Sequence, residues 1–390
     1  MLAHSPPLPL VIDYSNEGFS VEEEGIILAL EQRDRVRRIR LQVPVPNMQK
    51  LIMAVDEEYP VLEHLIMVPS TEDKSTALVL PETLQAPHLR HLSLRGFDLR
   101  KGSRLLTTSL GIVTLCLYME HPSAYFQPNT LLRWISSMQH LKTLLVAFLF
   151  PIPNRDVERQ PIHTPMVTDI TFPNLRSFVF RGVSAYLEAV VRRITAPHLE
   201  KLGIQFYKQL TYSIPRLLQF MNTAENLRFS SAKFKFSTDE VYVKLYPRQE
   251  TEMDTVSMAV RCWHLDWQVS SVAQIFNLPS QIFSTVDHLT LEYEVHGRSS
   301  EDHNEVDRAE WRNLLRSFSN LKTLRFDDGL VKELSCSLQL EDGELPLGLL
   351  PELQELTYSG SRYISYAFTS FIDARQNAGR PVALVRHSMY

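Results

Sequence analysis

One short phrase recurs along this chain: an apolar residue, a second apolar residue three positions later and a third two positions beyond that, often introduced by proline. It reads Pro-His-Leu-Arg-His-Leu-Ser-Leu at 87–94, Pro-Asn-Leu-Arg-Ser-Phe-Val-Phe at 173–180 and Pro-His-Leu-Glu-Lys-Leu-Gly-Ile at 197–204. A strand phrase that returns after helix-like stretches is typical of repeat proteins. The phrase therefore predicts a stacked-repeat architecture and weighs against a chemical active site.

The spacing of the phrases is irregular. Counted by the first apolar residue of each phrase, about twelve repeats begin at Val36, Leu62, Leu89, Ile112, Leu141, Leu175, Leu199, Leu227, Cys262, Val286, Leu321 and Leu353. The steps run from 23 to 35 residues, at and beyond the upper end of the roughly 20 to 29 usual for leucine-rich repeats. Leu227 and Cys262 match the pattern only in part. We expect an irregular leucine-rich-repeat array that contains insertions.

Several stretches between the phrases have helical spacing, namely 129–139, 184–195, 214–224, 305–319 and 365–377. A strand followed by a helix gives each chain segment the crossover it needs to return parallel to its predecessor. The predicted fold is thus α/β: a leucine-rich-repeat solenoid, or horseshoe, with a parallel sheet on its concave face and helices on its convex face.

The two ends have no complete phrase. Residues 1–34 are expected to form an N-terminal tail with a capping helix at Ser20 to Leu30, because acidic residues lead into an apolar run there. Residues 35–390 form the array, and Pro381 to His387 is interpreted as a closing strand. A single unit buries too little apolar surface to fold alone, so the array should be cooperative.

Composition restricts the partners and the compartment. A net charge of −5 gives no excess of cations for nucleic acid, so we expect no nucleic-acid partner. Cys116, Cys262 and Cys336 are odd in number and far apart, which indicates a reducing compartment. No stretch approaches 18 uninterrupted apolar residues, and the start has no basic segment of a signal peptide. We expect a soluble cytoplasmic or nuclear protein with no membrane partner.

Motifs that carry chemistry are missing from the sequence. It contains no H-E-x-x-H, P-loop, G-x-G-x-x-G or G-x-S-x-G. Five histidines directly precede a leucine of the phrase: His88, His140, His198, His264 and His288. Residues at equivalent repeat positions are spread along the stack, whereas metal ligands converge, so a structural role is favoured. We expect no enzyme activity, no cofactor and no metal.

The densest basic run comprises Arg33, Arg35, Arg37, Arg38 and Arg40. One interpretation is a site for a phosphate or an acidic partner. The other is protection by charge of the first, edge strand of the sheet.

The solvent-facing strand positions are the candidate site. Because alternate strand residues share a face, one side of the sheet should present Arg38, Arg40, Ile66, Val68, His91, Arg95, Arg181, Lys201, Asp266, Glu292, Asp327 and Glu355. This face would grade from basic to acidic and also carries apolar residues. Such a mixture suits a protein partner, although ordinary surface variation would explain it as well.

Four segments carry a resemblance to a known family. They are Ala-Pro-His-Leu-Arg-His-Leu at 86–92, Met-Gln-His-Leu-Lys-Thr-Leu at 138–144, Phe-Pro-Asn-Leu-Arg-Ser-Phe at 172–178 and Leu-Glu-Gln-Arg-Asp-Arg-Val-Arg-Arg-Ile at 30–39. Together they are similar to the irregular leucine-rich-repeat region of F-box proteins of mushroom-forming fungi. The resemblance implies that an F-box docks onto the adaptor of a cullin-type ubiquitin ligase while the repeats hold the substrate. No F-box phrase precedes Val36, so the chain is either a fragment or a member that lacks the adaptor-binding module.

The leading expectation is a non-enzymatic protein-binding module, the substrate-recognition part of an F-box-type receptor. A ligase adaptor would be a partner only where an upstream F-box exists. The alternative is a free-standing leucine-rich-repeat scaffold or inhibitor with no ligase connection. The rival from another class is an α/β enzyme whose site is assembled from loops, which would need a deep pocket of converging acids or histidines.

Overall fold

The computed structural model describes residues 8–15, 23–70, 77–99, 104–150, 169–207, 209, 211–247, 255–276, 283–294, 308–341, 343–359 and 366–387. The chain divides into two compact units, Met1–Leu199 and Glu200–Tyr390, here called unit 1 and unit 2.

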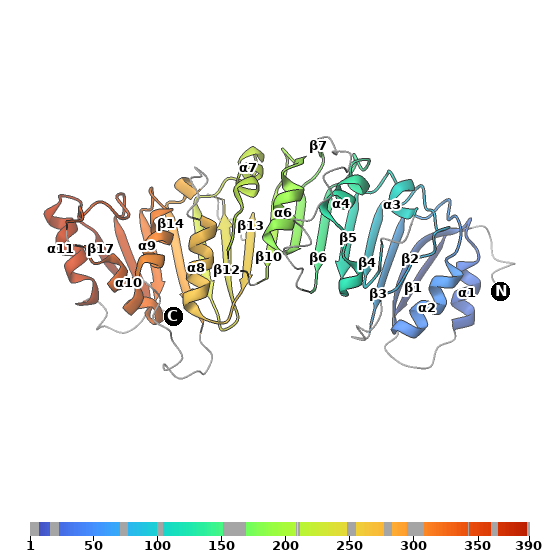
Figure 1. Ribbon diagram of the computed structural model, residues 1–390, viewed down its shortest axis with the longest axis horizontal. Coiled ribbons are helices and arrows are strands. Elements are labelled where there is room, and N and C mark those ends of the chain that lie inside the picture. The colour runs from blue at the N-terminus through green and yellow to red at the C-terminus, as the bar shows by residue number, and fades with distance from the viewer. Residues whose placement is uncertain are drawn as a thin grey trace. The chain divides into compact units, whose positions relative to one another are not determined.

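Unit 1 is built on a parallel sheet with strand order β1-β2-β3-β4-β5-β6-β8. Its strands are β1 (Leu10–Ser15), β2 (Val36–Val43), β3 (His64–Pro69), β4 (His91–Arg95), β5 (Thr114–Met119), β6 (Thr143–Phe148) and β8 (Ser177–Gly182), with the small pair β7 (Ile170–Thr171) and β9 (Ile194–Thr195). Its helices are α1 (Glu23–Leu30), α2 (Val45–Ala54), α3 (Leu105–Thr108), α4 (Pro128–Ile135) and α6 (Ser184–Val191), and a short 3₁₀ turn spans Pro122–Ala124. Figure 1 shows these helices in front of the strands.

The recurring phrase forms a turn followed by a strand. In the phrase at 86–94, the Leu89 amide donates to the Ala86 carbonyl at 3.1 Å, and Pro87 occupies the second turn position that its fixed φ suits. Equivalent bonds join Leu175 to Phe172 and Leu199 to Ala196. The turn buries the first apolar residue and starts the strand in a fixed phase, so the next two apolar residues also point inward.

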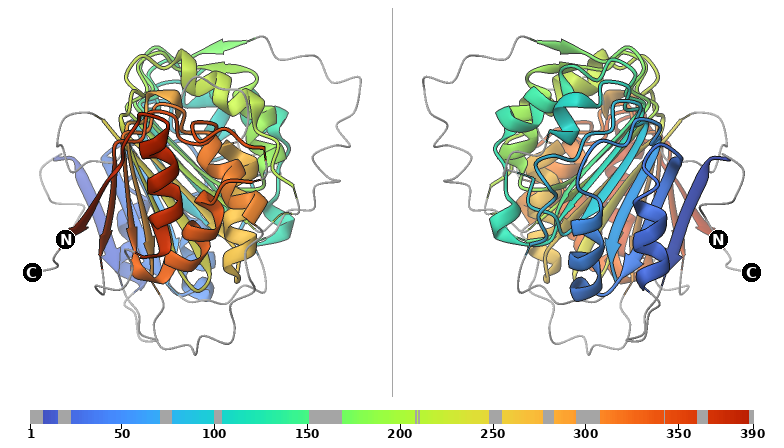
Figure 2. Two further views of the ribbon diagram at one scale, coloured as in Figure 1. Left: turned by 90° about the vertical axis from the view of Figure 1, so that its left-hand side faces the viewer. Right: turned by 90° about the vertical axis from the view of Figure 1, so that its right-hand side faces the viewer.

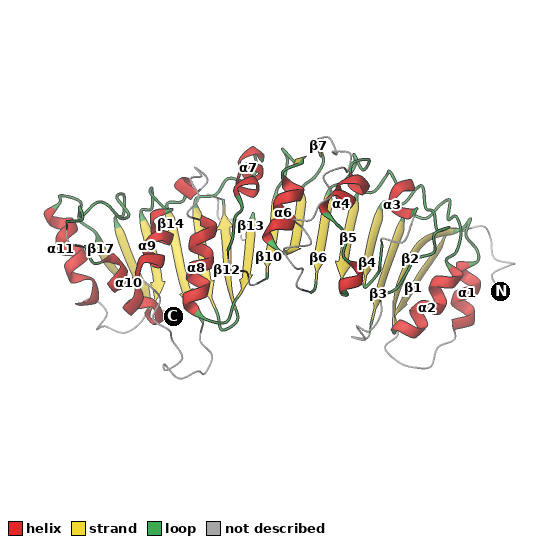
Figure 3. Ribbon diagram, viewed as in Figure 1, coloured by secondary structure: helices red, strands yellow, loops and turns green. Residues whose placement is uncertain are grey.

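Inward residues stack in register from strand to strand. One buried row runs through Leu65, Leu92, Leu115, Leu144 and Phe178, each at most 1% exposed. The helices cover this side of the sheet, as the blue α1 and α2 do beside their strands in the right-hand view of Figure 2. Figure 3 shows the helices of unit 1 in red in front of the yellow strands, and the side views of Figure 2 show no described helix on the other side of this sheet.

The N-terminal segment corrects one expectation. Residues 1–34 contain a strand as well as the helix, because β1 pairs in parallel with β2 through Ile12↔Ile39 and Asp13↔Arg40. The strand that begins at Val36 is therefore not an edge strand, and edge protection does not explain its arginines. The helix expected at Ser20 to Leu30 is present as α1, whose described residues begin at Glu23.

Unit 2 has the strand order β10-β13-β12-β11-β14-β15-β16-β17. Its strands are β10 (Lys201–Phe206), β11 (Ser231–Phe236), β12 (Glu240–Tyr246), β13 (Val256–Arg261), β14 (His288–Tyr293), β15 (Thr323–Asp327), β16 (Glu355–Ser359) and β17 (Ala383–His387). Its helices are α7 (Pro215–Thr223), α8 (Leu265–Phe276), α9 (Arg308–Arg316), α10 (Val331–Leu338) and α11 (Thr369–Asn377), with 3₁₀ turns at Phe283–Thr285 and Asp328–Leu330. The closing strand is confirmed, since β17 pairs in parallel with β16.

One strand of unit 2 runs against the others, and the strands around it are out of sequential order. Strand β12 is antiparallel to both β11 and β13, and β13 rather than β11 lies next to β10. The expectation of parallel pairing throughout is therefore wrong at this point. The sheet there is an up-and-down arrangement inserted between parallel neighbours.

Two weak phrase placements are wrong: one falls at a helix, and the other lies two residues too early for its strand. The phrase at Cys262 is not a strand: β13 ends at Arg261 and α8 begins at Leu265, so Asp266 lies in the first turn of a helix. At Leu227 the turn is present, with the Leu227 amide bonded to the Ala224 carbonyl, but β11 starts only at Ser231. Two extra residues separate turn and strand there, compared with His91 after Leu89.

The α/β class with a large, mostly parallel sheet is confirmed. Helices α2, α3, α8 and α10 were not predicted, and the predicted helix at 129–139 ends at Ile135. None of the helices in the described ranges combines the length and the apolarity that crossing a bilayer requires.

Candidate functional site

The helix-free side of the sheet in unit 1 brings most of the candidate residues together. This surface, the open face, comprises the outward residues of β2 to β8: Arg38, Arg40, Gln42, His64, Ile66, Val68, His91, Ser93, Arg95, Thr114, Cys116, Tyr118, Thr143, Leu145, Ala147, Ser177, Val179 and Arg181. All seven candidates from the first half of the sequence lie on it: Arg38, Arg40, Ile66, Val68, His91, Arg95 and Arg181.

An apolar strip crosses the middle of the open face. Ile66 is in register with Ser93, Ser93 with Cys116, Cys116 with Leu145 and Leu145 with Val179. Each side chain is half-buried, since its neighbours in the row stand about 4.8 Å away. Apart from Ser93 this row is apolar, and an apolar strip on an otherwise polar surface is typical of a site for another protein.

Arginines border this strip, and two of them are ion-paired across strands. The Arg95 Nε donates to the Glu120 Oε1 at 2.6 Å, and the Arg40 Nε lies 4.0 Å from the Asp13 Oδ1. Arg40 and Asp13 are both about half exposed, so their pair adds little stability. Among the described residues Arg38 has no ion-pair partner, and its charge is close enough to lower the pKa values of His64 and His91. Arg38 could therefore pair with an anionic group of a ligand without first breaking an ion pair to another described residue.

His64 and His91 form a stacked pair at one end of the strands. Their ring centroids are 4.3 Å apart and their planes differ by 4°. Partial burial lowers the pKa of His64, and the charges of His91 and Arg38 lower it further. Partial burial and the charge of Arg90 also lower the pKa of His91. Two imidazolium rings in face contact would repel each other, so the neutral pair is the stable form at neutral pH.

Cys116 and Tyr118 have no features of catalytic groups. Burial raises the pKa of the Cys116 thiol, which keeps it protonated and weakly nucleophilic. Burial is also the main reason why the pKa of Tyr118 is raised, with a further contribution from Cys116. Both side chains therefore lie on the open face in their protonated forms.

The candidates in unit 2 lie in different surroundings. Lys201 is exposed at the start of β10. Glu292 pairs with Lys233 at 2.6 Å, and Glu355 accepts a bond of 2.5 Å from the Thr357 hydroxyl. Asp327 accepts from the Ser359 hydroxyl at 2.7 Å.

These three acidic candidates of unit 2 are thus each engaged by a neighbouring group. For Glu292 the parallel pairing of β11 with β14 is the reason: it sets Lys235 opposite Glu292, and Lys233, two residues earlier on β11, reaches Glu292 diagonally. Asp266 does not belong to this strand surface, since it lies on α8.

The candidate set omitted several outward residues of the open face, and three of them bear on its chemistry. His64, Cys116 and Tyr118 occupy the same outward positions as the candidates, and the period-two rule applied to every phrase would have found them. The stacking of His64 on His91 needed the strand register, which no single phrase contains.

Within the described ranges, no group of three His, Cys, Asp or Glu side chains is placed to hold a metal ion. Comparison with known proteins finds no family model that matches this sequence, and no curated protein that matches it.

Proposed function

We propose that this chain is a non-enzymatic module that binds a partner protein on the open face of unit 1. The apolar strip through Ile66, Leu145 and Val179 supports the proposal, because it stands half-exposed on a sheet face that no described helix covers. The bordering arginines favour a partner whose apolar contact residues are flanked by carboxylates.

The finer form of the proposal is a leucine-rich-repeat solenoid that serves as the substrate-recognition part of an F-box-type ubiquitin-ligase receptor. It rests on the resemblance of the repeat phrases, together with the turn-and-strand geometry that each phrase adopts. Under this proposal the open face belongs to the concave surface, and a ligase adaptor binds only a form that carries an F-box.

The test compares capture by matched variants of the tagged chain, measured by quantitative mass spectrometry. The Arg38→Glu, Arg40→Glu double variant and a separate Ile66→Asp variant should each lose the same bound proteins by about tenfold or more. The control is Arg104→Glu with Arg133→Glu, which makes the same change in charge at exposed positions on the helix side of unit 1. Equal capture by the face variants and the wild type would show that the partner binds elsewhere.

A second arm addresses the ligase connection. A form extended upstream on the genome should recover the adaptor and the cullin if it contains an F-box, whereas the present chain should recover neither. Recovery of the adaptor by the present chain would contradict the division between an upstream F-box and a repeat module.

A further inference from the structure

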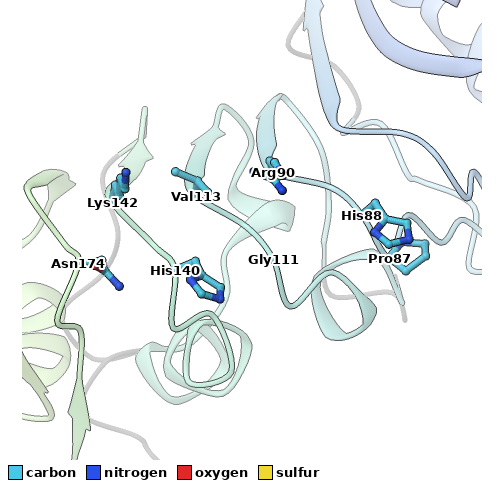
Figure 4. A pocket seen from close by; sticks show the side chains of 8 residues that line it. All are labelled: Pro87, His88, Arg90, Gly111, Val113, His140, Lys142 and Asn174. Atoms are coloured by element: carbon cyan, nitrogen blue, oxygen red, sulfur yellow. The ribbon is translucent and has the colours of Figure 1, made fainter. Parts of the chain in front are cut away.

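A groove of about 450 Å³ follows the edge of unit 1 where the parallel strands begin. The chain segments that precede β4, β5, β6 and β8 form it, through the residues on either side of each buried anchor. In Figure 4, Arg90, Val113 and Lys142 form one row, and His88, Gly111, His140 and Asn174 form a second. This groove is separate from the open face, whose residues belong to the strands themselves.

The groove exists because one repeat lacks bulk. Leu89, Ile112 and Leu141 are fully buried anchors, and their flanking residues point outward. Two of these repeats present a histidine and a long cation, namely His88 with Arg90 and His140 with Lys142. The repeat between them presents only Gly111 and Val113, so the surface is hollow there.

The lining is cationic. Arg90, Lys142, His88 and His140 are all exposed, Asn174 adds an amide, and none of the described lining side chains is acidic. Glu63 lies outside this lining but close enough for the charge of Arg90 to lower its pKa, and its carboxylate is held by Arg37 at 2.9 Å. Nitrogen donors without competing carboxylates are the chemistry that recognises a carboxylate or another anion.

The backbone on this edge is not available to a ligand. The Val113 amide donates to the Arg90 carbonyl and the Lys142 amide to the Val113 carbonyl, both at 2.8 Å, and the Arg176 amide donates to the Lys142 carbonyl. A peptide cannot add here as a further strand, because strand addition needs free main-chain donors and acceptors. Recognition must go through side chains.

The spacing of the two long cations selects a peptide geometry. Arg90 precedes β4 and Lys142 precedes β6, so they stand two strand spacings apart, about 10 Å. A polyproline II helix turns once in three residues and rises about 9.3 Å per turn. It presents every third side chain on one side at nearly the distance between these cations. Pro87 and Val113 give the remaining wall an apolar surface for proline rings.

We propose that this groove binds a proline-rich acidic segment of a partner protein, in polyproline II conformation, with a carboxylate at every third residue. The probe is a fluorescein-labelled peptide of Glu-Pro-Pro repeats, measured by anisotropy at low salt against the intact chain. Its control is a peptide of the same composition whose glutamates are grouped in adjacent pairs. The wild type should bind the repeat peptide at least about fivefold more tightly, since only that peptide matches both cations at once.

The variants separate groove binding from general charge attraction. Arg90→Gln with Lys142→Gln should weaken binding about tenfold or more, whereas Arg104→Gln with Arg133→Gln, with the same loss of charge, should leave it unchanged. Gly111→Leu fills the hollow and should also abolish the preference for the repeat peptide over the control peptide. Gly111→Ala should not, because a methyl group there would lie 3.7 Å from the Leu89 carbonyl oxygen, an ordinary contact.

Three results would overturn the proposal. They are equal binding of the two peptides, an equal effect of the two charge-matched double variants, and displacement of the peptide by inorganic phosphate or by an oligothymidylate at lower concentration than by unlabelled peptide. The assay contains no cellular partner. Its failure would therefore leave the proposal for the open face untouched.

Discussion

The imidazole rings of His64 and His91 stack face to face on adjacent strands, with centroids 4.3 Å apart. The contact joins β3 to β4 on the open face and places Arg38 in the same row, because Arg38 is in register with His64 and His64 with His91. A cation beside two stacked neutral rings is stable only while the rings stay unprotonated.

This relationship predicts a stability that depends on pH. The pKa values of both histidines are lowered on folding, mainly by burial. The unfolded chain therefore binds more protons than the folded chain just below about pH 6.5, and the free energy of unfolding must fall as pH decreases through that range. Arg37, Arg38, Arg90 and Glu63 also act on the pair and are retained in the test.

The measurement is the thermal midpoint of unfolding at several pH values between neutral and mildly acidic. The double variant His64→Gln, His91→Gln should show a shallower fall in the midpoint than the wild type. The control is His140→Gln, in an exposed turn outside the stack. Equal slopes for wild type and double variant would remove the histidine pair as the cause.

A second prediction contrasts two neighbours on β3. Leu65 is 0% exposed in the core under the helices, while Ile66 is half-buried on the open face. Leu65→Ala should lower the free energy of unfolding by about 2 to 5 kcal/mol, through lost burial and a new cavity. Ile66→Ala should cost less than about 1.5 kcal/mol, because its site can refill with water. Urea unfolding of both variants checks this, and similar costs would mean that the open face is covered in solution.

A third prediction concerns Tyr59, which fastens two helix ends. Its hydroxyl donates to the Leu30 carbonyl at 2.9 Å, at the end of α1, and lies 3.4 Å from the Ala54 carbonyl, at the end of α2. Burial raises its pKa to about 12. Tyr59→Phe should lower the free energy of unfolding by about 1 to 3 kcal/mol, because buried carbonyls lose a donor.

Hydrogen exchange is the sharper readout for this variant. Exchange in α1 should accelerate in Tyr59→Phe, while the half-buried Tyr118→Phe on the open face serves as the control. Unchanged protection of α1 would show that the hydroxyl does not hold the helix.

A fourth prediction addresses a buried cation of unit 2. The Arg312 side chain is 2% exposed; it donates to the Ser337 carbonyl at 2.8 Å and pairs with Glu344. Burial tends to raise the pKa of Glu344, but the Glu341 amide and Arg312 outweigh burial and lower it. Arg312→Met should lower the free energy of unfolding by about 3 to 5 kcal/mol, because it leaves the Glu344 carboxylate without its cation.

Adding Glu344→Gln to Arg312→Met should restore part of that loss, since the uncompensated charge is then gone. Urea titration of the two single variants and the double variant measures the coupling. Strict additivity would show that the two side chains do not act as a pair.

The phrase predicted local structure well because its information is local. A turn with proline at its second position buries Leu89 and sets the phase of the following strand, so the outward positions of Ile66, Arg95 and Arg181 could be read from period two. For this reason seven of the twelve candidate residues lie on the open face, as predicted.

Pairing could not be predicted in the same way. Val241, Val243 and Leu245 on β12 alternate as a parallel strand would, and nothing in that alternation says that the strand runs backward. At Cys262 the aromatic residues suit a helix face as well as a strand, and α8 forms there. The charge pair Lys233 with Glu292 also depends on register between β11 and β14, which are separated by the whole inserted segment.

The order β10-β13-β12-β11 has a consequence for how unit 2 assembles. Strand β11 runs in the same direction as β10 and leaves the ribosome earlier than β13, so it meets the free flank of β10 first. Docking there would follow the rule that every other repeat obeys, yet it would exclude β12 and β13 from the sheet. We therefore expect the yield of native pairing to depend on how fast the β11–β12 and β12–β13 hairpins close relative to docking of β11 on β10.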